Sequence, residues 1–456
     1  MHLTPFAAIT LFGWLLVVLA AALRSRPFAV FVGVLVGIYS LVALGLRPAF
    51  SLMGAYEIVP TVLHATVYLN FALLSRPRMR TTLYRVLVSW PSAFFSAGTL
   101  FGMPWAVAYA LGFHPWAPWL PYLAATIGMA QSLSTKKSVV ELIVHGPEGA
   151  VVPALVPHPS GAEGHERSTR PLRIVQLSDP HLGPFMSVAR LRGIAARAVA
   201  EQPDLIFLTG DFLTMESQRE ATHLRDAFAP FKAMPGRVFA CHGNHDHEAP
   251  AVVKQALDDN GIRLLIDEAH ELETPAGPVQ IVGMDFAFRD RATRMAKVCA
   301  AYPRKPDHLR IVLLHDPGAF PHLGEGEGDL VLAGHTHGGQ IGLTSLGIPW
   351  TVVRSFGGRI PDQGLWARGT DRLYVHRGTG HYGFPLRLGV SAEESVLHLH
   401  RAPGAAEQAS LLVCCDHQSG AIGGQIRLRS PDATSLQVWC ARIFRPRRVR
   451  VRCLQR

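Results

Sequence analysis

The sequence predicts an α/β domain that follows an α-helical transmembrane domain. Three observations lead to this fold class. Long apolar runs with few charges dominate the first 137 residues, whereas from Leu172 onward strand-length apolar runs alternate with helical stretches. Almost every one of those later runs ends in Asp, His or Asn. A chain of 456 residues is long enough for two or three domains.

Five apolar segments make up the predicted transmembrane domain, residues 1–137. The first, residues 6–23, carries no charge and is long enough to cross a bilayer. Because its amino-terminal flank has no Lys or Arg and further apolar segments follow, we expect a span and not a cleaved signal peptide. The other segments are residues 28–46, 58–74, 86–113 and 119–133. The last of them is short and contains Pro121.

The basic residues of this region predict its orientation. They gather after the first, third and fifth segments, while the loops after the second and fourth hold Arg47 alone. Positively charged loops stay on the cytoplasmic side. We therefore expect a multi-pass protein with its amino terminus outside and the following domain in the cytoplasm. If the fifth segment does not span, that domain lies on the other face.

Positive charge is confined to the two ends of the chain. Residues 1–137 carry a net charge of +8 and residues 403–456 of +6, so the middle is acidic although the whole chain is +10. The high isoelectric point thus reflects a topology signal and a basic tail, and no nucleic-acid partner is expected. Residues 138–171, rich in Pro, Gly, His and Ser, are predicted to be a linker. The tail, 403–456, is predicted to be disordered.

Residues 172–402 form the predicted α/β domain. Six apolar runs have strand length and lie at 172–179, 204–211, 237–246, 279–285, 309–316 and 329–337. Helical patterns separate them at 188–201, 218–234, 251–260 and 290–301. The later runs at 372–378 and 395–401 have no helix between them, which indicates a second or a mixed sheet.

Metal-binding side chains follow five of these runs. They are Asp179 and His181, Asp211, Asn244 with His245 and Asp246, His315, and His335 with His337. Because functional sites assemble at the carboxyl ends of strands, we expect these side chains to converge. Glycines at 210, 243 and 334 allow tight turns beside them.

Oxygen and imidazole ligands without thiolate suit Mn, Fe, Zn, Co or Ni. Seven such donors are too many for one ion and fit two divalent ions, which together can clamp a phosphoryl group. Each residue alone would more often form a turn or cap a helix. The ordered set, with every member at a strand end, favours the metal site.

The five blocks resemble, in their order, the calcineurin-like metallophosphoesterase family. They are Asp179-Pro180-His181, Gly210-Asp211, Gly243-Asn244-His245-Asp246, His315 and Gly334-His335-Thr336-His337, and the resemblance covers residues 172–401. The stretches 338–340 and 377–389 look like the membrane-associated bacterial branch, some of whose members act on lipids or on UDP-diacylglucosamine. The resemblance implies a four-layer α/β/β/α metallophosphoesterase sandwich and a bacterial-type inner (plasma) membrane.

The resemblance also implies which residues hold each ion. Asp179, His181 and His337 would hold the first ion. Asn244, His315 and His335 would hold the second. Asp211 would bridge the two.

Two further residues receive roles in the same way. His245 matches the histidine that is not a ligand and that protonates the leaving group or stabilises the transition state, for which an imidazole is suited near neutral pH. Asp246 is either a carboxylate that orients His245 or a plain turn residue. In the Gly-rich turn that follows the domain's later strands, His381 is expected on the loop surface and not at the substrate.

The function expected from these features is that of a membrane-anchored binuclear-metal phosphoesterase. It would hydrolyse a phosphoester or pyrophosphate bond, in a lipid-linked substrate such as UDP-diacylglucosamine or a phospholipid. Two alternatives stay open: a phosphodiesterase acting on soluble nucleotides, and a non-catalytic metal-binding regulatory module.

Overall fold

The computed structural model describes residues 4–144, 152–157, 170–356, 360–401, 439–442 and 451–454. The chain divides into two compact units, Met1–Ala402 and Pro403–Arg456. In the second unit the backbone of an antiparallel hairpin is described, β14 (Trp439–Arg442) with β15 (Val451–Leu454). The rest of the tail predicted to be disordered lies outside the described residues.

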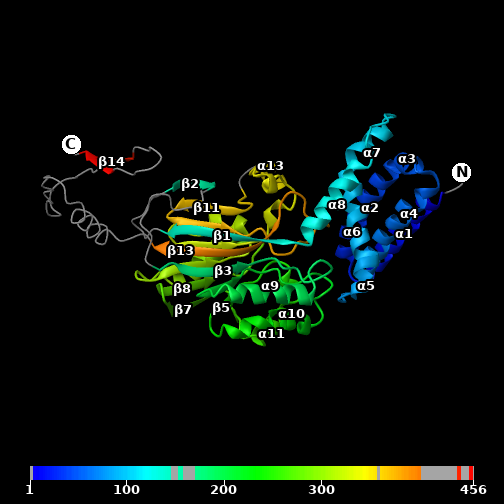
Figure 1. The fold of residues 1–456 in the computed structure, drawn as a ribbon. Helices are drawn as coiled ribbons and strands as arrows, with labels where there is room; N and C mark the ends of the chain where they lie inside the picture. The colour runs from blue at the N-terminus through cyan, green and yellow to red at the C-terminus, as the bar shows by residue number, and fades with distance from the viewer. Residues whose placement is uncertain are drawn as a thin grey trace, which may run out of the picture. The chain divides into compact units, whose positions relative to one another are not determined.

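Two sheets form the centre of the first unit (Figure 1). The first sheet has the order β1 (Thr135–Val144), β13 (Ala392–Arg401), β3 (Leu172–Leu177), β4 (Leu205–Leu208), β5 (Val238–Ala240) and β6 (Arg263–Leu264). The second has the order β2 (Val152–Pro157), β11 (Gly364–Gly369), β12 (Asp371–Val375), β10 (Leu330–Ala333), β9 (Leu309–Leu313), β8 (Gly277–Gly283) and β7 (Glu268–Thr274). Strands β3 to β6 are parallel, as are β8, β9, β10 and β12.

Side chains of the two sheets meet in one central core. Ile174 and Phe207 of the first sheet pack there with Ile281 and Leu313 of the second. The other face of the first sheet, which includes Val175, lies under α9 (Val188–Ala200), α10 (Ala221–Phe228) and α11 (Pro250–Asp258). The outer face of the second sheet is covered by α12 (Arg291–Ala301). Because both faces of each sheet are buried, the strands read as continuous apolar runs, and the four-layer α/β/β/α prediction is confirmed.

The predicted boundary between membrane domain and linker is corrected. Residues Thr135–Val144 form β1, which runs parallel to β13 along its whole length, so the supposed linker begins inside the first sheet. The inward side chains are Val140, Leu142 and Val144, which alternate with the less buried Val139, Glu141 and Ile143 as a half-buried strand requires. Of the rest of 138–171, the structure describes β2 and the two residues before β3, and 145–151 and 158–169 lie outside the described residues.

The regular elements described in the amino-terminal region, up to residue 134, are all helices, joined by irregular segments such as residues 77–81 and 113–115. It consists of α1 (Pro5–Ala22), α2 (Arg26–Gly45), α3 (Arg47–Ser51), α4 (Ile58–Leu73), α5 (Thr82–Tyr84), α6 (Trp90–Phe101), α7 (Met103–Ala110) and α8 (Leu120–Ser132). Helices α1 and α2 are long and apolar enough to cross a membrane, and Thr82–Phe101 with Met103–Ala110 would form a third span bent by 53°. Helices α4 and α8 have 16 and 13 residues, fewer than the roughly 20 that a straight span needs. The count of five spans therefore stays a prediction.

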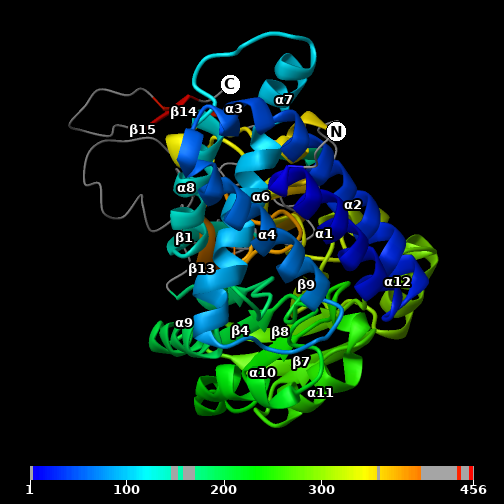
Figure 2. The ribbon, with the colours of Figure 1, turned by 90° about the vertical axis from the view of Figure 1, so that its right-hand side faces the viewer.

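Several contacts join these helices to the sandwich (Figure 2). The indole Nε1 of Trp90 donates to the carbonyl of Pro184 at 3.3 Å, and the amide of Arg387 donates to Oγ of Ser132 at 2.8 Å. The basic loops also touch the sandwich. Arg24 donates to the side chain of Gln218 at 3.2 Å. The basic loop after α1 therefore lies beside the α/β domain.

Candidate metal centre

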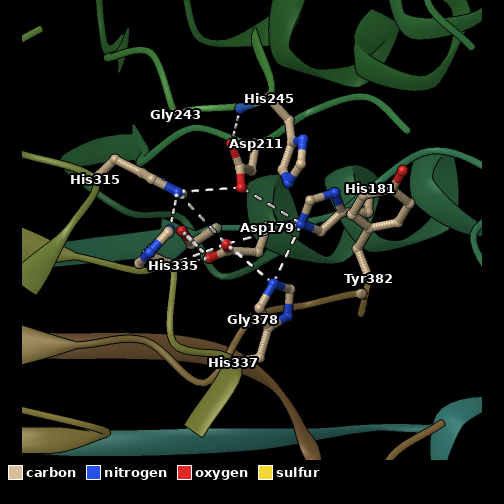
Figure 3. Close-up of polar contacts among 12 residues, drawn as sticks. Asp179, His181, Asp211, Gly243, His245, His315, His335, His337, Gly378 and Tyr382 are labelled. Atoms are coloured by element: carbon tan, nitrogen blue, oxygen red, sulfur yellow. Dashed lines mark hydrogen bonds and ion pairs between the residues drawn. The ribbon is translucent and has the colours of Figure 1, made fainter. Parts of the chain in front are cut away.

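The predicted ligands converge in two clusters at the carboxyl ends of the strands (Figure 3). One cluster contains Asp179, His181 and His337, and the other contains Asp211, His315 and His335, with the ligand atoms of each cluster within 4.8 Å of one another. The Nε2 atoms of His181 and His337 are 3.2 Å apart, as are Nε2 of His315 and Nδ1 of His335. The loops after β3 and β4 come from the first sheet, and those after β9 and β10 from the second.

Asp211 lies between the clusters. Its Oδ1 accepts a hydrogen bond from the amide of His245 at 2.9 Å, which fixes the carboxylate. Its Oδ2 lies 3.2 Å from Nε2 of His315 in one cluster and 3.6 Å from Nε2 of His181 in the other. One oxygen atom thus faces both groups of ligands, as a bridging carboxylate must.

Backbone strain marks the same residues. Positive φ angles occur at Asp179 (51°), His181 (46°), Asp211 (57°), His335 (70°) and His337 (53°). These are half of the ten non-glycine residues with positive φ in the described part of the chain. Such angles are costly for residues with a Cβ and persist where the surroundings fix them, often at functional sites.

Two glycines let the loops approach the carboxylates. A Cβ on Gly243 would collide with Oδ1 of Asp211, and one on Gly334 would collide with Oδ2 of Asp179. Any larger residue would push the carboxylates out of the clusters. The expectation that glycines make room beside the site is confirmed for these two positions.

The electrostatics of the clusters suit a bound cation. Burial lowers the pKa of His181 to about 3 and that of His335 to about 4, so both imidazoles are neutral, the form that binds metals. Burial also opposes charge on His315, but Asp211 raises its pKa to about 10. In turn, although burial favours the neutral carboxyl, His315 holds the pKa of Asp211 below its usual range. A metal ion would displace the proton that this pair shares.

The residues present fit divalent metal ions. The Oδ1 atom of Asn244 is buried and has no hydrogen-bond partner among the described residues. Such an atom is costly unless it has a ligand. The carbonyl oxygen of Thr209 lies 2.7 Å from Nδ1 of His315, which leaves Nε2 of that ring for the centre.

His245 stands apart from the ligands, and the carboxylate beside it is not the one predicted. Its Nδ1 lies 2.7 Å from Oε1 of Glu248. Asp246 instead accepts hydrogen bonds from the backbone amides of Asp211, Phe212 and Gly243 at 2.7 to 2.9 Å. Of the two alternatives for Asp246, these contacts favour a turn residue that holds the two loops together over a carboxylate that orients His245.

Sequence reasoning also missed residues in the 377–389 stretch. The ring of Tyr382 stacks on His181 with centroids 5.0 Å apart and meets His245 edge-on at 4.9 Å. Arg387 is fully buried, and its Nη1 donates to the carbonyl of His337 at 3.0 Å. His381, expected on the loop surface, is only 6% exposed and packs on Phe185. The sequence of this stretch shows the family resemblance, but it does not show the contacts of Tyr382, Arg387 and His381, because these depend on residues far away in the chain.

Comparisons with known proteins agree with this geometry. The sequence model of the calcineurin-like phosphoesterase family matches residues 172–339. Phosphodiesterase YaeI of Escherichia coli (strain K12) is 31% identical to this chain over 50% of the chain and 82% of the relative. A bovine transmembrane protein with metallophosphoesterase domain (Bos taurus) is 29% identical over 62% of the chain and 64% of the relative.

A third relative is the UDP-2,3-diacylglucosamine pyrophosphatase LpxG of Chlamydia muridarum (strain MoPn / Nigg). It is 26% identical over 46% of this chain and 78% of its own length. Relatives of this family thus include proteins that are associated with membranes, as the apolar helices α1 and α2 suggest for this chain. The match to most of the Escherichia coli relative, together with the family model, shows that the chain belongs to the calcineurin-like phosphoesterase family and is a metal-dependent phosphoester hydrolase.

Proposed function

We propose that this hydrolase acts at a binuclear metal centre on a phosphoester or pyrophosphate bond of a lipid-linked substrate, such as UDP-diacylglucosamine or a phospholipid. The observation that carries the proposal is the position of Oδ2 of Asp211, which faces both ligand clusters. The apolar helices lie beside this domain, as the contact between Trp90 and Pro184 shows. The chlamydial relative, whose name makes it a pyrophosphatase of UDP-2,3-diacylglucosamine, supports the substrate class.

Seven residues would hold the ions. Asp179, His181 and His337 would bind one, Asn244, His315 and His335 the other, with Asp211 shared. When bound, the two divalent ions supply charge stabilisation for the phosphoryl group and activate the attacking water.

His245 would donate the proton to the leaving group. Glu248 occupies its Nδ1, so Nε2 is the atom left for the leaving oxygen. Burial alone would lower the pKa of His245, but the hydrogen bond to Glu248 and the nearby Asp211 raise it. The raised pKa of His245 favours the protonated form that a general acid needs.

The localisation belongs to the same proposal. We expect a multi-pass protein of a bacterial-type inner membrane with the hydrolase domain in the cytoplasm. The contact of Arg24 with Gln218 of the sandwich supports it, since it places the basic loop after α1 on the side of the domain.

Hydrolysis of a chromogenic aryl phosphodiester by the purified full-length protein tests the activity. With Mn²⁺ we expect turnover that chelation removes, and His245→Ala should lower kcat by about 10²- to 10⁴-fold because the leaving group loses its acid. Asp211→Ala should abolish turnover. The control is His223→Ala, a histidine on α10 outside the site. Equal turnover in His245→Ala, Asp211→Ala and wild type would overturn the proposal, and an absence of turnover in the wild type would favour a regulatory module.

A further inference from the structure

An apolar groove runs between the amino-terminal helices and the hydrolase domain. It has a volume of about 380 Å³, within the range of ligand pockets, roughly 300–1,000 Å³. Helices α2, α4 and α6 supply its walls. The apolar side chains include Phe31, Leu35, Val36, Phe71, Leu74 and Leu100.

One end of the groove reaches the metal centre. His181, a predicted ligand, lines it together with Tyr382, whose ring stacks on that histidine. Phe384 lines the same end and packs against Phe101 of α6 at 5.4 Å between centroids. The groove is thus continuous with the site where the phosphoryl group would bind.

The other walls open toward the apolar surface of the helices. Phe31 is 62% exposed, and Val30 and Val34 beside it on α2 are exposed as well. In a bilayer these side chains would face hydrocarbon, so a lipid chain could enter sideways without crossing water.

Most polar groups in the groove wall bond within the protein. The hydroxyl of Ser89 donates to Oδ1 of Asn70 at 3.2 Å, and that of Ser96 donates to the carbonyl of Ala93 at 3.2 Å. Glu216 of the hydrolase domain is the exception, because its Oε2 is buried without a hydrogen-bond partner among the described residues. A polar ligand would therefore find few free partners along the part of the wall that the helices supply. An alkyl chain needs none.

We propose that this groove binds an acyl chain of the lipid-linked substrate while the substrate's phosphoryl group lies at the metal centre. The inference rests on the proposed function and adds where the lipid part binds. It makes the amino-terminal helices part of the substrate site and not a tether alone.

Chain-length dependence tests the proposal in the full-length protein with Mn²⁺. The substrates are p-nitrophenyl alkyl phosphates of increasing alkyl length. We expect kcat/KM to rise by about fourfold per added methylene until the groove is filled, because each buried methylene leaves water. Leu35→Trp, which narrows the groove, should lower the ratio of long-chain to short-chain kcat/KM at least tenfold.

Leu41→Trp is the matched control. Leu41 lies on the same helix, is 72% exposed and does not line the groove, so its substitution should leave that ratio at the wild-type value. Two results would show that the groove does not bind the acyl chain. One is activity that does not depend on chain length, and the other is the same ratio of long-chain to short-chain kcat/KM in Leu35→Trp and wild type. Neither result would contradict the proposed function.

Photocrosslinking tests acyl-chain binding in the groove without the need for catalytic turnover. The probe is a phosphatidic acid that carries a diazirine at the end of one acyl chain. We expect labels on peptides that contain Phe31, Leu35 or Leu100 and a loss of these labels in Leu35→Trp. Labels spread over the outer faces of the helices, or crosslinks between two copies of the chain at the groove, would overturn the proposal. If no phosphodiester is hydrolysed at all, the proposed function is wrong. The labelling pattern would still test whether an acyl chain binds in the groove.

Discussion

Glu248 is the carboxylate that holds His245, and its own position is fixed in turn. Oε2 of Glu248 accepts a hydrogen bond from Gln218 at 2.7 Å, and Gln218 accepts one from Arg24 at the end of α1. A chain of hydrogen bonds therefore leads from the first membrane helix to the proposed proton donor. Glu248 is a positioning residue, because it acts through His245.

Glu248→Gln should lower kcat about tenfold and change KM little, since second-layer partners of this kind contribute about 10- to 100-fold. Steady-state kinetics with an aryl phosphodiester measure both constants. Glu268→Gln, an exposed residue on β7, is the control. A rise of KM with unchanged kcat would contradict a positioning role for Glu248.

At the residue scale the sequence pointed to the candidate ligands, but it did not point to Glu248, which positions His245. Asp179, Asp211 and the histidines follow strand ends in an order that resembles the phosphoesterase family, so the sequence could point to them as candidate ligands. Glu248 lies in an ordinary helical turn, and its contact with His245 depends on the loop conformation that follows β5. Neither composition nor spacing signals such a contact.

At the scale of elements, Glu393 connects the two sheets beneath the site. It lies on β13 of the first sheet, and it accepts hydrogen bonds from the hydroxyl of Tyr374 on β12 of the second sheet, at 2.5 Å, and from the amide of Arg377, at 3.0 Å. Burial would raise the pKa of Glu393, but the Arg377 guanidinium and His376 outweigh burial and hold it at about 2.

This pKa predicts how stability depends on pH. Because the folded-state pKa lies below the ordinary value of 4.5, Glu393 stabilises the fold fully above pH 4.5, and the contribution is lost as the pH falls toward 2. Glu393→Gln should cost about 3 kcal/mol at pH 7 and progressively less below pH 4.5. Thermal unfolding of the detergent-solubilised protein measures the difference.

The control for this prediction is Glu271→Gln, which removes an exposed ion pair with Lys305 and should change the unfolding temperature little at any pH. A stability loss in Glu393→Gln that stays constant from pH 7 to pH 2 would show that Glu393 acts through packing and not through charge.

The strands that surround the site were predictable because they are buried on both faces. The first strand was not, because the residues beside Val140, Leu142 and Val144 include Val139 and Ile143, so the sequence shows no clear alternation of apolar and polar residues. The pattern directly follows an apolar segment and precedes a Pro- and Gly-rich stretch, so it reads as part of a linker. Its pairing with β13, more than 250 residues away, supplies the strand character.

At the scale of the whole molecule, the helices and the sandwich form one functional unit in our account. Apolar composition predicted the helices and placed the ends of α1, α2, α4 and α8 to within two residues, but it did not predict the 53° bend between α6 and α7 inside the segment 86–113. It also could not predict the groove, which arises where α2, α4 and α6 meet the loop that contains Tyr382.

Membrane sidedness is the prediction that belongs to this scale. A fluorescent protein fused after Arg456 should fluoresce, because that reporter folds in the cytoplasm, and a phosphatase reporter there should be inactive. The same reporters placed after Gly112, between α7 and α8, should give the opposite pattern. Matching signals at both positions would mean that α8 does not cross the membrane.

The metal content of the full-length protein tests the central claim most directly. Inductively coupled plasma mass spectrometry on protein purified with Mn²⁺ should give two ions per chain, and Asp211→Ala should lose at least one of them together with activity, since Asp211 faces both clusters. An active protein that holds one ion or none would contradict a binuclear centre.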